Sequence, residues 1–368
     1  MTVDNLDDNH FPDRGLRPAE RLAGMDLPNG WKVESAHFPE KNSTGGQFSV
    51  QYIVSSESGD KAFLKAMDFE SSLASVSPTD KLYETIQNFR HERQLNQICE
   101  SMTRVVRLLD SGETHVDPAD PYSAVFYLIF ELADSDIRAH VSRQDQDDVG
   151  HLLQLMHQVS VASQQLHSAK ISHLDIKPSN VLVFRQLGAR LADLGRSIVS
   201  GQSSPVGSFA CMGDMRYAPL ELLYANVRPE WKDNRESCDF YLLGNLLFFL
   251  LTSSSLTQML SNRLVKLDSS LHYGNRAMSY DHVFPYVSRT FFQIIRELRS
   301  DPRVDYVPEI VDVVRQFCDP DPSQRGLPLN RGASRYSLQR LISRLDLLHK
   351  RNRFSHLHST RSGKELLS

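Results

Sequence analysis

The feature that most constrains this chain is one short polar segment near its middle. The segment reads HLDIKPSN at residues 173–180, and DLG follows at residues 193–195. Carboxylate and carboxamide oxygens are ligands that Mg²⁺ prefers, and a lysine beside a carboxylate can offset charge on a phosphoryl group in transfer. An ordinary loop of turn residues rarely combines these eight residues with a second acidic segment thirteen residues after the asparagine. The pattern therefore predicts phosphoryl-transfer chemistry.

These two segments resemble the catalytic loop and the magnesium loop of eukaryotic-type protein kinases. The resemblance implies that Asp175 orients or deprotonates a Ser or Thr hydroxyl and that Lys177 stabilises the γ-phosphoryl. It further implies that Asn180 and Asp193 hold Mg²⁺ on ATP. Lys177, two residues after Asp175, is typical of the serine/threonine type. We expect an α+β, bilobal kinase-like fold with a small β-rich lobe and a larger, mainly helical lobe.

Composition narrows the possible partners and compartment. The chain has 368 residues, a net charge of −4 and 40% hydrophobic residues, so it has no basic excess for binding nucleic acid. Its most apolar segment, residues 240–252, contains Asn245 and is shorter than the ~20 residues that a bilayer crossing needs. We therefore expect neither a nucleic-acid nor a membrane partner. Four cysteines without paired spacing suit a reducing compartment, and we expect a cytoplasmic protein.

The pattern along the chain predicts its division into domains. Residues 1–28 are acidic and proline-containing, which is typical of a leader without stable structure. We expect the kinase-like domain over residues 29–350, with its N-lobe at 29–132 and its C-lobe at 133–350. Residues 351–368 form a basic tail for which disorder is the default expectation.

Local periodicity predicts the elements of these lobes. Strands are expected within residues 31–67, where Phe48, Val50 and Tyr52 alternate with polar residues. A helix is expected from Ser77-Pro78 to about Cys99. The further expected elements are strands at residues 105–109 and 124–132 and helices at residues 152–166, 240–252 and 338–348.

The resemblance extends to residues expected to bind the nucleotide phosphates. Lys65 ends an apolar strand and Glu92 lies in the following helix, so we expect the two to form the ion pair that supports the phosphates. A phosphate-covering loop is expected at Thr44, Gly45, Gly46 and Phe48. A plain hairpin turn would look similar, and only Gly46 falls on a family glycine.

An adenine site is implied at the junction of the predicted lobes. Phe130, Glu131 and Ala133 fall where the family has its hinge, and Leu182 falls at the position that forms the adenine floor. Gln51 and Phe63 occupy positions where the family prefers small or branched apolar residues. Either the strands carry a one-residue bulge or the adenine slot is narrower than usual.

Three positions outside the nucleotide site indicate a protein substrate. Glu221 follows Ala-Pro near the end of the predicted activation segment, and we expect it to pair with Arg325. Asp239 resembles the aspartate that anchors the backbone of the catalytic loop. Kinases that phosphorylate small molecules generally lack these features.

Three departures from the family pattern concern control rather than chemistry. Leu174 replaces the arginine that often clamps a phosphorylated activation loop, so we expect activity that does not require phosphorylation there. Asp214 replaces a threonine, and we expect it to lie close enough to Lys177 for a salt bridge. Asn96 replaces an apolar contact and must find a hydrogen-bond partner if it is buried.

The resulting hypothesis is an ATP- and magnesium-dependent Ser/Thr protein kinase with a protein substrate. Two alternatives stay open: a pseudokinase scaffold with impaired nucleotide binding, and a small-molecule phosphotransferase. Residues 253–305 lie where relatives place docking helices, so a partner surface is plausible there. A variable, solvated insertion explains that segment equally well.

Overall fold

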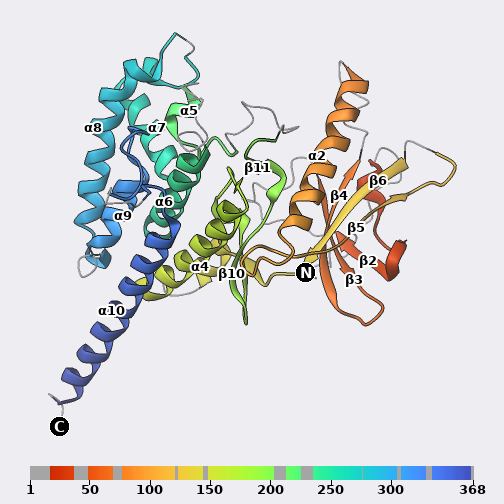
Figure 1. Cartoon of the computed structure of the whole chain (residues 1–368), viewed down its shortest axis with the longest axis horizontal. Coiled ribbons are helices and arrows are strands. Elements are labelled where there is room, and N and C mark those ends of the chain that lie inside the picture. The colour runs from red at the N-terminus through yellow and green to blue at the C-terminus, as the bar shows by residue number, and fades with distance from the viewer. Residues whose placement is uncertain are drawn as a thin grey trace, which may run out of the picture. The chain divides into compact units, whose positions relative to one another are not determined.

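The computed structural model describes most of the chain and divides it into two compact units (Figure 1). Unit 1 comprises Met1–Phe89 and Leu108–Leu132, and unit 2 comprises Arg90–Arg107 and Ala133–Ser368. One boundary between the units falls between Leu132 and Ala133, and another falls between Phe89 and Arg90, within the helix Pro78–Ile98. The described residues are 17–36, 49–68, 77–120, 123–143, 148–202, 213–224, 235–275, 277–304, 308–328 and 334–365.

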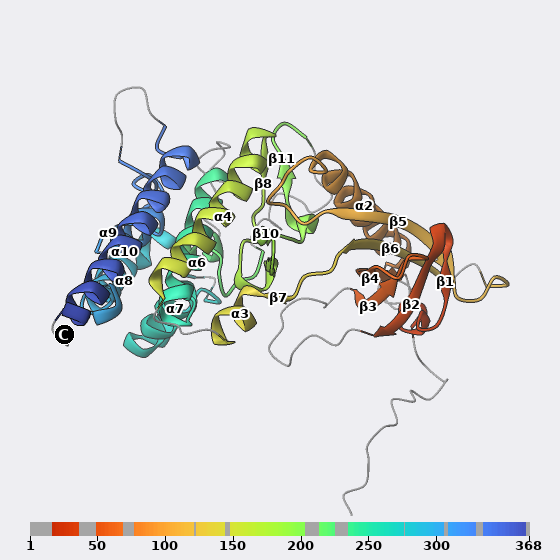
Figure 2. The same ribbon diagram turned by 90° about the horizontal axis from the view of Figure 1, so that it is seen from below.

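Unit 1 contains a six-stranded antiparallel sheet in the order β1-β2-β3-β4-β6-β5 (Figure 2). Successive side chains of β4 point to opposite faces, and one face buries Ala62, Leu64 and Ala66 in the small core of this unit. The strands are β1 Asp26–Leu27, β2 Trp31–Ala36, β3 Val50–Ser55, β4 Lys61–Asp68, β5 Leu108–His115 and β6 Ala124–Glu131.

The expected unstructured leader is wrong for its last twelve residues. Residues 17–28 contain a 3₁₀ turn at Pro18–Arg21 followed by β1. Ala19, Leu22 and Leu27 are buried against the sheet, and the Tyr52 hydroxyl donates to the Ala19 carbonyl at 2.7 Å. Three buried apolar side chains and one buried hydrogen bond order this short segment, although the leader of residues 1–28 is acidic and polar as a whole. Residues 1–16 lie outside the described residues.

Helix α2, Pro78–Ile98, matches the predicted helix and belongs to both units. In unit 1 the Phe89 ring lies against Phe126 of β6, with ring centroids 4.9 Å apart and an angle of 32° between the ring planes. In unit 2 Leu95 joins the large core. The strand predicted at residues 105–109 is mostly wrong, because Val105 forms only an isolated bridge with Leu191 and β5 begins at Leu108.

Unit 2 is mainly helical and carries small sheets that position its loops. A three-stranded sheet has the order β10-β9-β7, and β11 pairs with β8. The strands are β7 Ser135–Asp136, β8 Ile171–Ser172, β9 Val181–Phe184, β10 Gly188–Leu191 and β11 Ile198–Val199. The helices are α3 Ile137–Arg143, α4 Val149–Ser168, α5 Leu220–Leu223, α6 Ser237–Thr252, α7 Leu256–Leu267, α8 Tyr280–Arg299, α9 Glu309–Phe317 and α10 Leu338–Glu365.

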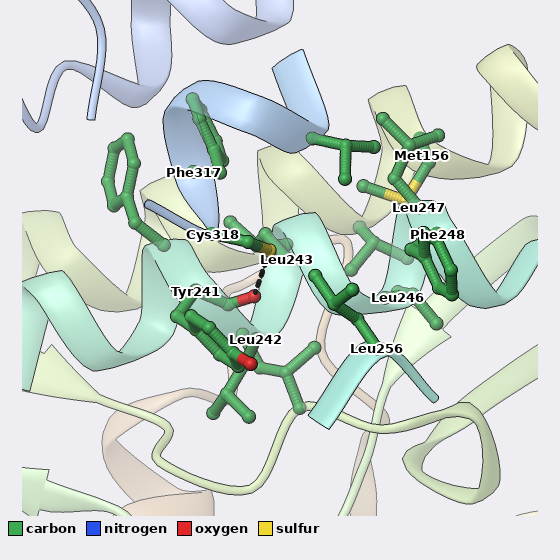
Figure 3. Packing of buried hydrophobic residues seen from close by; sticks show 14 of the residues in the cluster. Met156, Tyr241, Leu242, Leu243, Leu246, Leu247, Phe248, Leu256, Phe317 and Cys318 are labelled. Atoms are coloured by element: carbon green, nitrogen blue, oxygen red, sulfur yellow. Dashed lines mark hydrogen bonds between the residues drawn. The ribbon is translucent and has the colours of Figure 1, made fainter. Parts of the chain in front are cut away.

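Helix α6 lies in the core of unit 2 (Figure 3). Its apolar residues contact α4 and α9, as the cluster around Met156, Leu247 and Phe317 shows. Gly244 permits the close approach of the chain after α9, because a Cβ there would lie 2.6 Å from the Cys318 Sγ. No single helix in the described ranges passes a test of length and hydropathy for crossing a membrane, although α6 and α7, bent by 83°, pass it as a pair.

The predicted terminal helix is longer than expected. Helix α10 begins at Leu338 and continues to Glu365, so the expectation of a disordered tail from residue 351 is wrong as far as Glu365. Arg351 contacts Glu309 of α9 at 3.1 Å. A helix already anchored on a core can be extended without a new nucleation step, even though residues 352–363 are mostly weak helix formers such as Asn, Ser, His and Thr.

Candidate active site

The catalytic loop of unit 2 is held by one buried carboxylate. Asp239, near the start of α6, accepts hydrogen bonds from the backbone amides of His173 at 2.9 Å and Leu174 at 2.8 Å. His167 of α4 also contacts Asp239, at 2.7 Å. Two charge-assisted hydrogen bonds fix the start of the loop, where Leu174 adopts a left-handed φ of 64°. The predicted anchoring role of Asp239 is confirmed.

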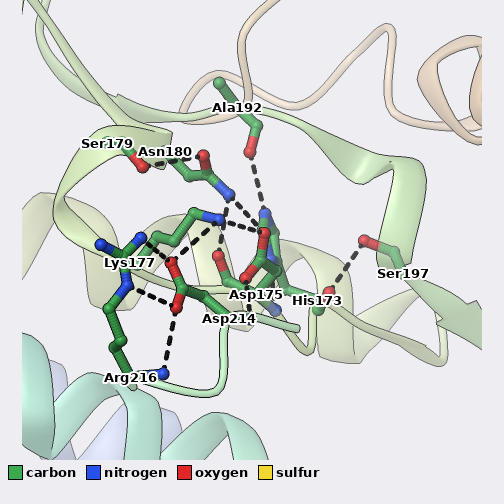
Figure 4. A network of polar contacts seen from close by, with 9 residues as sticks. All are labelled: His173, Asp175, Lys177, Ser179, Asn180, Ala192, Ser197, Asp214 and Arg216. Atoms are coloured by element: carbon green, nitrogen blue, oxygen red, sulfur yellow. Dashed lines mark hydrogen bonds and ion pairs between the residues drawn. The ribbon is translucent and has the colours of Figure 1, made fainter. Parts of the chain in front are cut away.

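Asp175 lies at the centre of a polar network (Figure 4). Its Oδ2 accepts from the Asn180 Nδ2 at 3.0 Å and lies 3.0 Å from the Lys177 ammonium. Its Oδ1 accepts from the Asp214 backbone amide at 2.9 Å. Burial raises the pKa of Asp175, the Lys177 charge opposes that rise, and the Asp193 charge adds to it. These donors hold the carboxylate in one orientation.

Lys177 lies between two carboxylates. Its ammonium is 3.0 Å from Asp175 and 3.8 Å from Asp214, so the predicted contact between Asp214 and Lys177 forms. Arg216 also binds Asp214, through Nε at 2.9 Å and a terminal nitrogen at 2.7 Å. Burial alone would raise the pKa of Asp214, but hydrogen bonds from Arg216 and the charge of Lys177 lower it below its ordinary value.

The end of the activation segment approaches Asp175 very closely at Gly213. A Cβ at this position would lie 2.6 Å from both the Asp175 Oδ1 and the Leu174 carbonyl oxygen. Gly213 also has a φ of 53°, which L side chains rarely adopt. Only glycine allows the backbone of the activation segment to lie directly on the catalytic loop.

Asn180 and Asp193 offer oxygen ligands on adjacent loops. The Asn180 amide nitrogen donates to the Asp175 carbonyl at 2.9 Å and to the Asp175 Oδ2 at 3.0 Å, and the Asn180 Oδ1 accepts a 3.4 Å hydrogen bond from the Ser179 hydroxyl. A carbonyl oxygen has two lone pairs, so this oxygen can also bind a cation. The Ala192 amide donates to the Asn180 carbonyl at 2.8 Å and so joins the two loops. Asp193 has a left-handed φ of 64°.

This pair of oxygen donors fits Mg²⁺ bound with a nucleotide. Mg²⁺ in phosphoryl-transfer sites takes one or two protein oxygens and fills its remaining positions with phosphates and water. Within the described ranges, no group of three or more His, Cys, Asp or Glu residues is arranged to hold a metal by itself. A carboxylate and a carboxamide are therefore the donor set that the phosphates would complete.

Glu92 of α2 lies beside the magnesium loop. It is only 4% exposed, and a Cβ on Gly195 would be 3.2 Å from its Oε2. One turn later, the Asn96 side chain donates to the Glu92 carbonyl at 2.8 Å, so the buried amide finds its partner within its own helix. His91 contacts the Ser197 carbonyl at 2.8 Å. This part of α2 is thus tied to the loop that carries Asp193.

The residues of unit 1 that are predicted to contact the nucleotide, on β3 and β4, lie where these two strands pair without interruption. Lys65 of β4 pairs in register with Gln51 of β3, and Phe63 pairs with Ile53 on one side and Phe130 on the other. The β3–β4 pairing runs from Val50 to Ser55 without a register shift, so the alternative of a one-residue bulge is wrong there. Phe63 and Lys65 share the partly exposed face of β4, which is opposite the buried core face.

The remaining predicted nucleotide residues are distributed over several elements. Phe130 and Glu131 end β6 in unit 1, while Ala133 begins the connection in unit 2 and Leu182 lies half-buried on β9. Lys65 belongs to unit 1 and Glu92 to unit 2, so their ion pair stays a prediction. The phosphate-covering residues Thr44, Gly45, Gly46 and Phe48 lie outside the described residues.

The predicted pair behind the activation segment is present. The Arg325 guanidinium contacts the Glu221 carboxylate at 2.6 Å, and both side chains are buried. Arg325 also lies over the ring of Tyr241 and donates to the Asp319 carbonyl at 3.0 Å. A buried arginine needs such partners because an uncompensated charge in the core is costly.

Sequence reasoning missed the role of Asn245. Its Nδ2 donates to the Tyr217 carbonyl at 3.0 Å, and its Oδ1 accepts from the Leu256 amide at 2.8 Å. Asn245 therefore ties the activation segment to the start of α7. The available signal was an amide side chain within the apolar run of residues 240–251, since a fully buried amide needs hydrogen-bond partners.

Comparison with known proteins agrees with this geometry. A family model described as "Protein kinase domain" matches residues 44–328, most of the chain. A Wee1-like protein kinase of Arabidopsis thaliana is 29% identical over 133 residues, which cover 36% of this chain and 25% of the relative. Mitogen-activated protein kinase 2 of Pneumocystis carinii is 25% identical over 187 residues, half of each chain.

Mitogen-activated protein kinase 14 of Arabidopsis thaliana is similar at a comparable level. It is 24% identical over 190 residues, which cover 46% of this chain and 48% of the relative. The chain thus spans between a quarter and a half of the length of these three relatives. The family match covers the catalytic loop, the magnesium loop and the Glu221–Arg325 pair, and the chain belongs to the protein kinase domain family.

Proposed function

We propose that the protein is an active serine/threonine protein kinase that transfers the γ-phosphoryl of Mg-ATP to a protein hydroxyl. The observation that carries this proposal is the network around Asp175. Its carboxylate is oriented by Asn180, Lys177 and the Asp214 amide, as a base that receives an acceptor hydroxyl requires. No catalytic group of the motif is replaced in this chain.

The chain's own side chains would act mainly by positioning. Asp175 orients the acceptor hydroxyl and accepts its proton, and Lys177, fixed between two carboxylates, offsets charge on the phosphoryl in transfer. Asn180 and Asp193 would hold Mg²⁺, which neutralises phosphate charge when it is bound. Positioning and charge stabilisation supply most of the acceleration in phosphoryl transfer.

Binding of ATP is assigned to residues of both units. We propose that Lys65 contacts the phosphates and that Glu92 holds Lys65 in place. The hinge would hydrogen-bond the adenine, and Leu182 would form its floor. The residues assigned to ATP contact are Thr44, Gly45, Gly46, Phe48, Lys65, Phe130, Glu131, Ala133 and Leu182.

A protein acceptor is the best-supported substrate class. The buried Glu221–Arg325 pair and the Asn245 contacts brace the end of the activation segment, which supports a stable platform for a peptide. Residues 256–267 and 280–299 form α7 and α8, so helices are available where we propose a docking partner binds. We also propose a cytoplasmic location, from the scattered cysteines.

The test of catalysis is replacement of the proposed base. Asp175→Asn should lower phosphorylation of a generic protein substrate by about 10²–10⁴-fold, because the variant cannot accept the hydroxyl proton. Transfer is measured with radiolabelled ATP and magnesium, and Mg-ATP binding by thermal shift. Equal transfer by the wild-type protein and the variant would exclude Asp175 as the base.

One observation favours a second candidate function, a pseudokinase scaffold. Because β3 and β4 pair without a bulge, Phe63 stays at the position where a small residue is usual. A narrowed adenine slot would prevent nucleotide binding. Mg-ATP at about 100 times its Kd should stabilise a binding-competent protein by about 2.7 kcal/mol. No stabilisation at millimolar Mg-ATP would favour the scaffold.

A further inference from the structure

Unit 2 carries an arginine-rich surface that the proposed catalysis does not use. Three of its arginines, Arg296, Arg299 and Arg315, line an open pocket of about 440 Å³ between α8 and α9. The other lining residues are Asp312 and the apolar Phe292 and Ile295. Helix α9 contacts α8 on one side, and Arg344 of α10 contacts α9 (Figure 1).

Helix α10 extends this surface. Arg344 donates to the Gln316 side chain at 3.1 Å and to the Glu309 carbonyl at 3.3 Å. Arg351 contacts the Glu309 carboxylate at 3.1 Å. The arginine patch is defined as Arg296, Arg299, Arg315, Arg344 and Arg351 together with the carboxylates Asp312 and Glu309.

The patch has a surplus of positive charge in a chain that is acidic overall. Five arginines face two carboxylates, a local surplus of three charges, whereas the whole chain has a net charge of −4. Arg296 is exposed and makes no ion pair with the described part of the chain. Each guanidinium presents several donors in a planar fork that suits carboxylates.

The pattern of contacts distinguishes between possible ligands. Asp312 lies 2.6 Å from Arg299 and 3.8 Å from Arg315, so a single anion placed between these arginines would meet a carboxylate. An extended peptide can instead place one acidic side chain on each exposed guanidinium. The side chains of Arg299, Arg315 and Arg351 are 53%, 39% and 60% exposed. Phe292 is 38% exposed beside the cations, which offers a contact for an apolar side chain.

We propose that the arginine patch is a docking site for an extended acidic segment of a partner protein, with an apolar side chain seated on Phe292 and Ile295. Charge complementarity with the arginines would speed association and set the specificity, and the apolar contact would anchor the segment. The site is composed of α8, α9 and α10 residues, so it does not depend on nucleotide binding or on Asp175.

The test uses a fluorescein-labelled peptide, Glu-Asp-Glu-Phe-Glu-Asp-Glu, with the full chain and without ATP. Fluorescence anisotropy should show saturable binding that weakens as salt rises from about 50 to about 300 mM. The uncharged analogue Gln-Asn-Gln-Phe-Gln-Asn-Gln should bind at least about tenfold more weakly. Equal binding of both peptides, or no binding of the acidic peptide at about 1 mM, would overturn the proposal.

Matched variants locate the site. Arg296→Glu should weaken peptide binding by about tenfold or more, because it reverses a charge that no ion pair of the described residues uses. Phe292→Ala should weaken binding by a smaller factor. Arg185→Glu makes the same charge change at a side chain that is 89% exposed on the β9–β10 turn, and should change binding less than about twofold.

Two further outcomes would count against docking at this patch. If Arg185→Glu weakens binding as much as Arg296→Glu, the peptide responds only to overall charge. If inorganic phosphate displaces the peptide more effectively than sodium chloride of equal ionic strength, the patch is a small-anion site instead. Unchanged melting temperatures of the variants exclude loss of folding as the cause.

Discussion

Two arginine–carboxylate pairs hold the end of the activation segment, and they are built in opposite ways. Arg325 and Glu221 are both buried, with side chains 1% and 6% exposed. In the second pair only the arginine is exposed: Arg216 is 48% exposed, whereas Asp214, which it binds, is 10% exposed and also lies beside Lys177. Removing one partner of a buried pair leaves an uncompensated charge, whereas an exposed partner is replaced by water. The buried pair therefore supports the fold, and the pair with the exposed arginine shapes the site.

The largest expected effect comes from breaking the buried pair. Arg325→Met should lower the free energy of unfolding by about 3–5 kcal/mol, because Glu221 would stay buried without its partner. Urea unfolding followed by circular dichroism measures the loss, and Arg216→Met is the matched control. The double variant Glu221→Leu/Arg325→Met should recover most of the stability. Equal losses for Arg325→Met and Arg216→Met would contradict the distinction.

A smaller effect is expected where the segment touches the catalytic loop. Gly213→Ala adds a Cβ 2.6 Å from the Asp175 Oδ1 at a positive φ, and should cost about 1–3 kcal/mol and displace the base. Gly201 has a φ of 78° but open space around its Cβ position, so Gly201→Ala isolates the backbone strain. Kinase activity should fall much further for Gly213→Ala. Similar activities for the two variants would exclude the contact with Asp175 as important.

Breaking the pair with the exposed arginine should have a still smaller effect on stability, because water can solvate Arg216 when its partner is lost. Asp214→Asn keeps the backbone amide that donates to Asp175 but removes the charge that faces Arg216 and Lys177. The free energy of unfolding should change by about 0–1 kcal/mol. The melting temperature and the steady-state rate of phosphorylation measure the two roles separately. A loss of stability as large as that of Arg325→Met would show that Asp214 belongs to the fold.

The smallest expected effect is that of activation-segment phosphorylation on the rate at which the protein phosphorylates its substrate. Leu174 offers no guanidinium to a phosphoserine, so activity should not require phosphate on Ser200, Ser203, Ser204 or Ser208. Protein produced without kinases and checked by mass spectrometry should phosphorylate substrate at a rate similar to that of protein phosphorylated in vitro. An unphosphorylated protein that is inert until phosphorylated would contradict this expectation.

The sequence predicted the contacts that follow from charge and motif spacing. The partners of Asp239 and Arg325 could be named because a buried carboxylate or guanidinium must be paired, and the resemblance supplied each partner. The contact of Asp214 with Lys177 followed from the same reasoning. The order at residues 17–28 was missed because the segment is short, lacks a regular period of apolar residues and follows an acidic, polar stretch.

The arginine patch could not be predicted, for a different reason. Its members come from α8, α9 and α10, and Arg296 and Arg351 are far apart in the sequence. No local pattern brings them together, since the grouping depends on which helix faces become neighbours after packing. The absence of a bulge between β3 and β4 was likewise undecided, because strand register depends on both partners.

The close approach at Gly244 has a consequence for the whole C-terminal half of the protein. A methyl group added there would collide with Phe317 and Cys318, immediately upstream of the turn that delivers Arg325 to Glu221. A substitution inside α6, away from the catalytic loop, would thus displace the Arg325 guanidinium from Glu221. A substitution at this glycine would therefore lower activity through misfolding around α6 and α9, even though every catalytic side chain is unchanged.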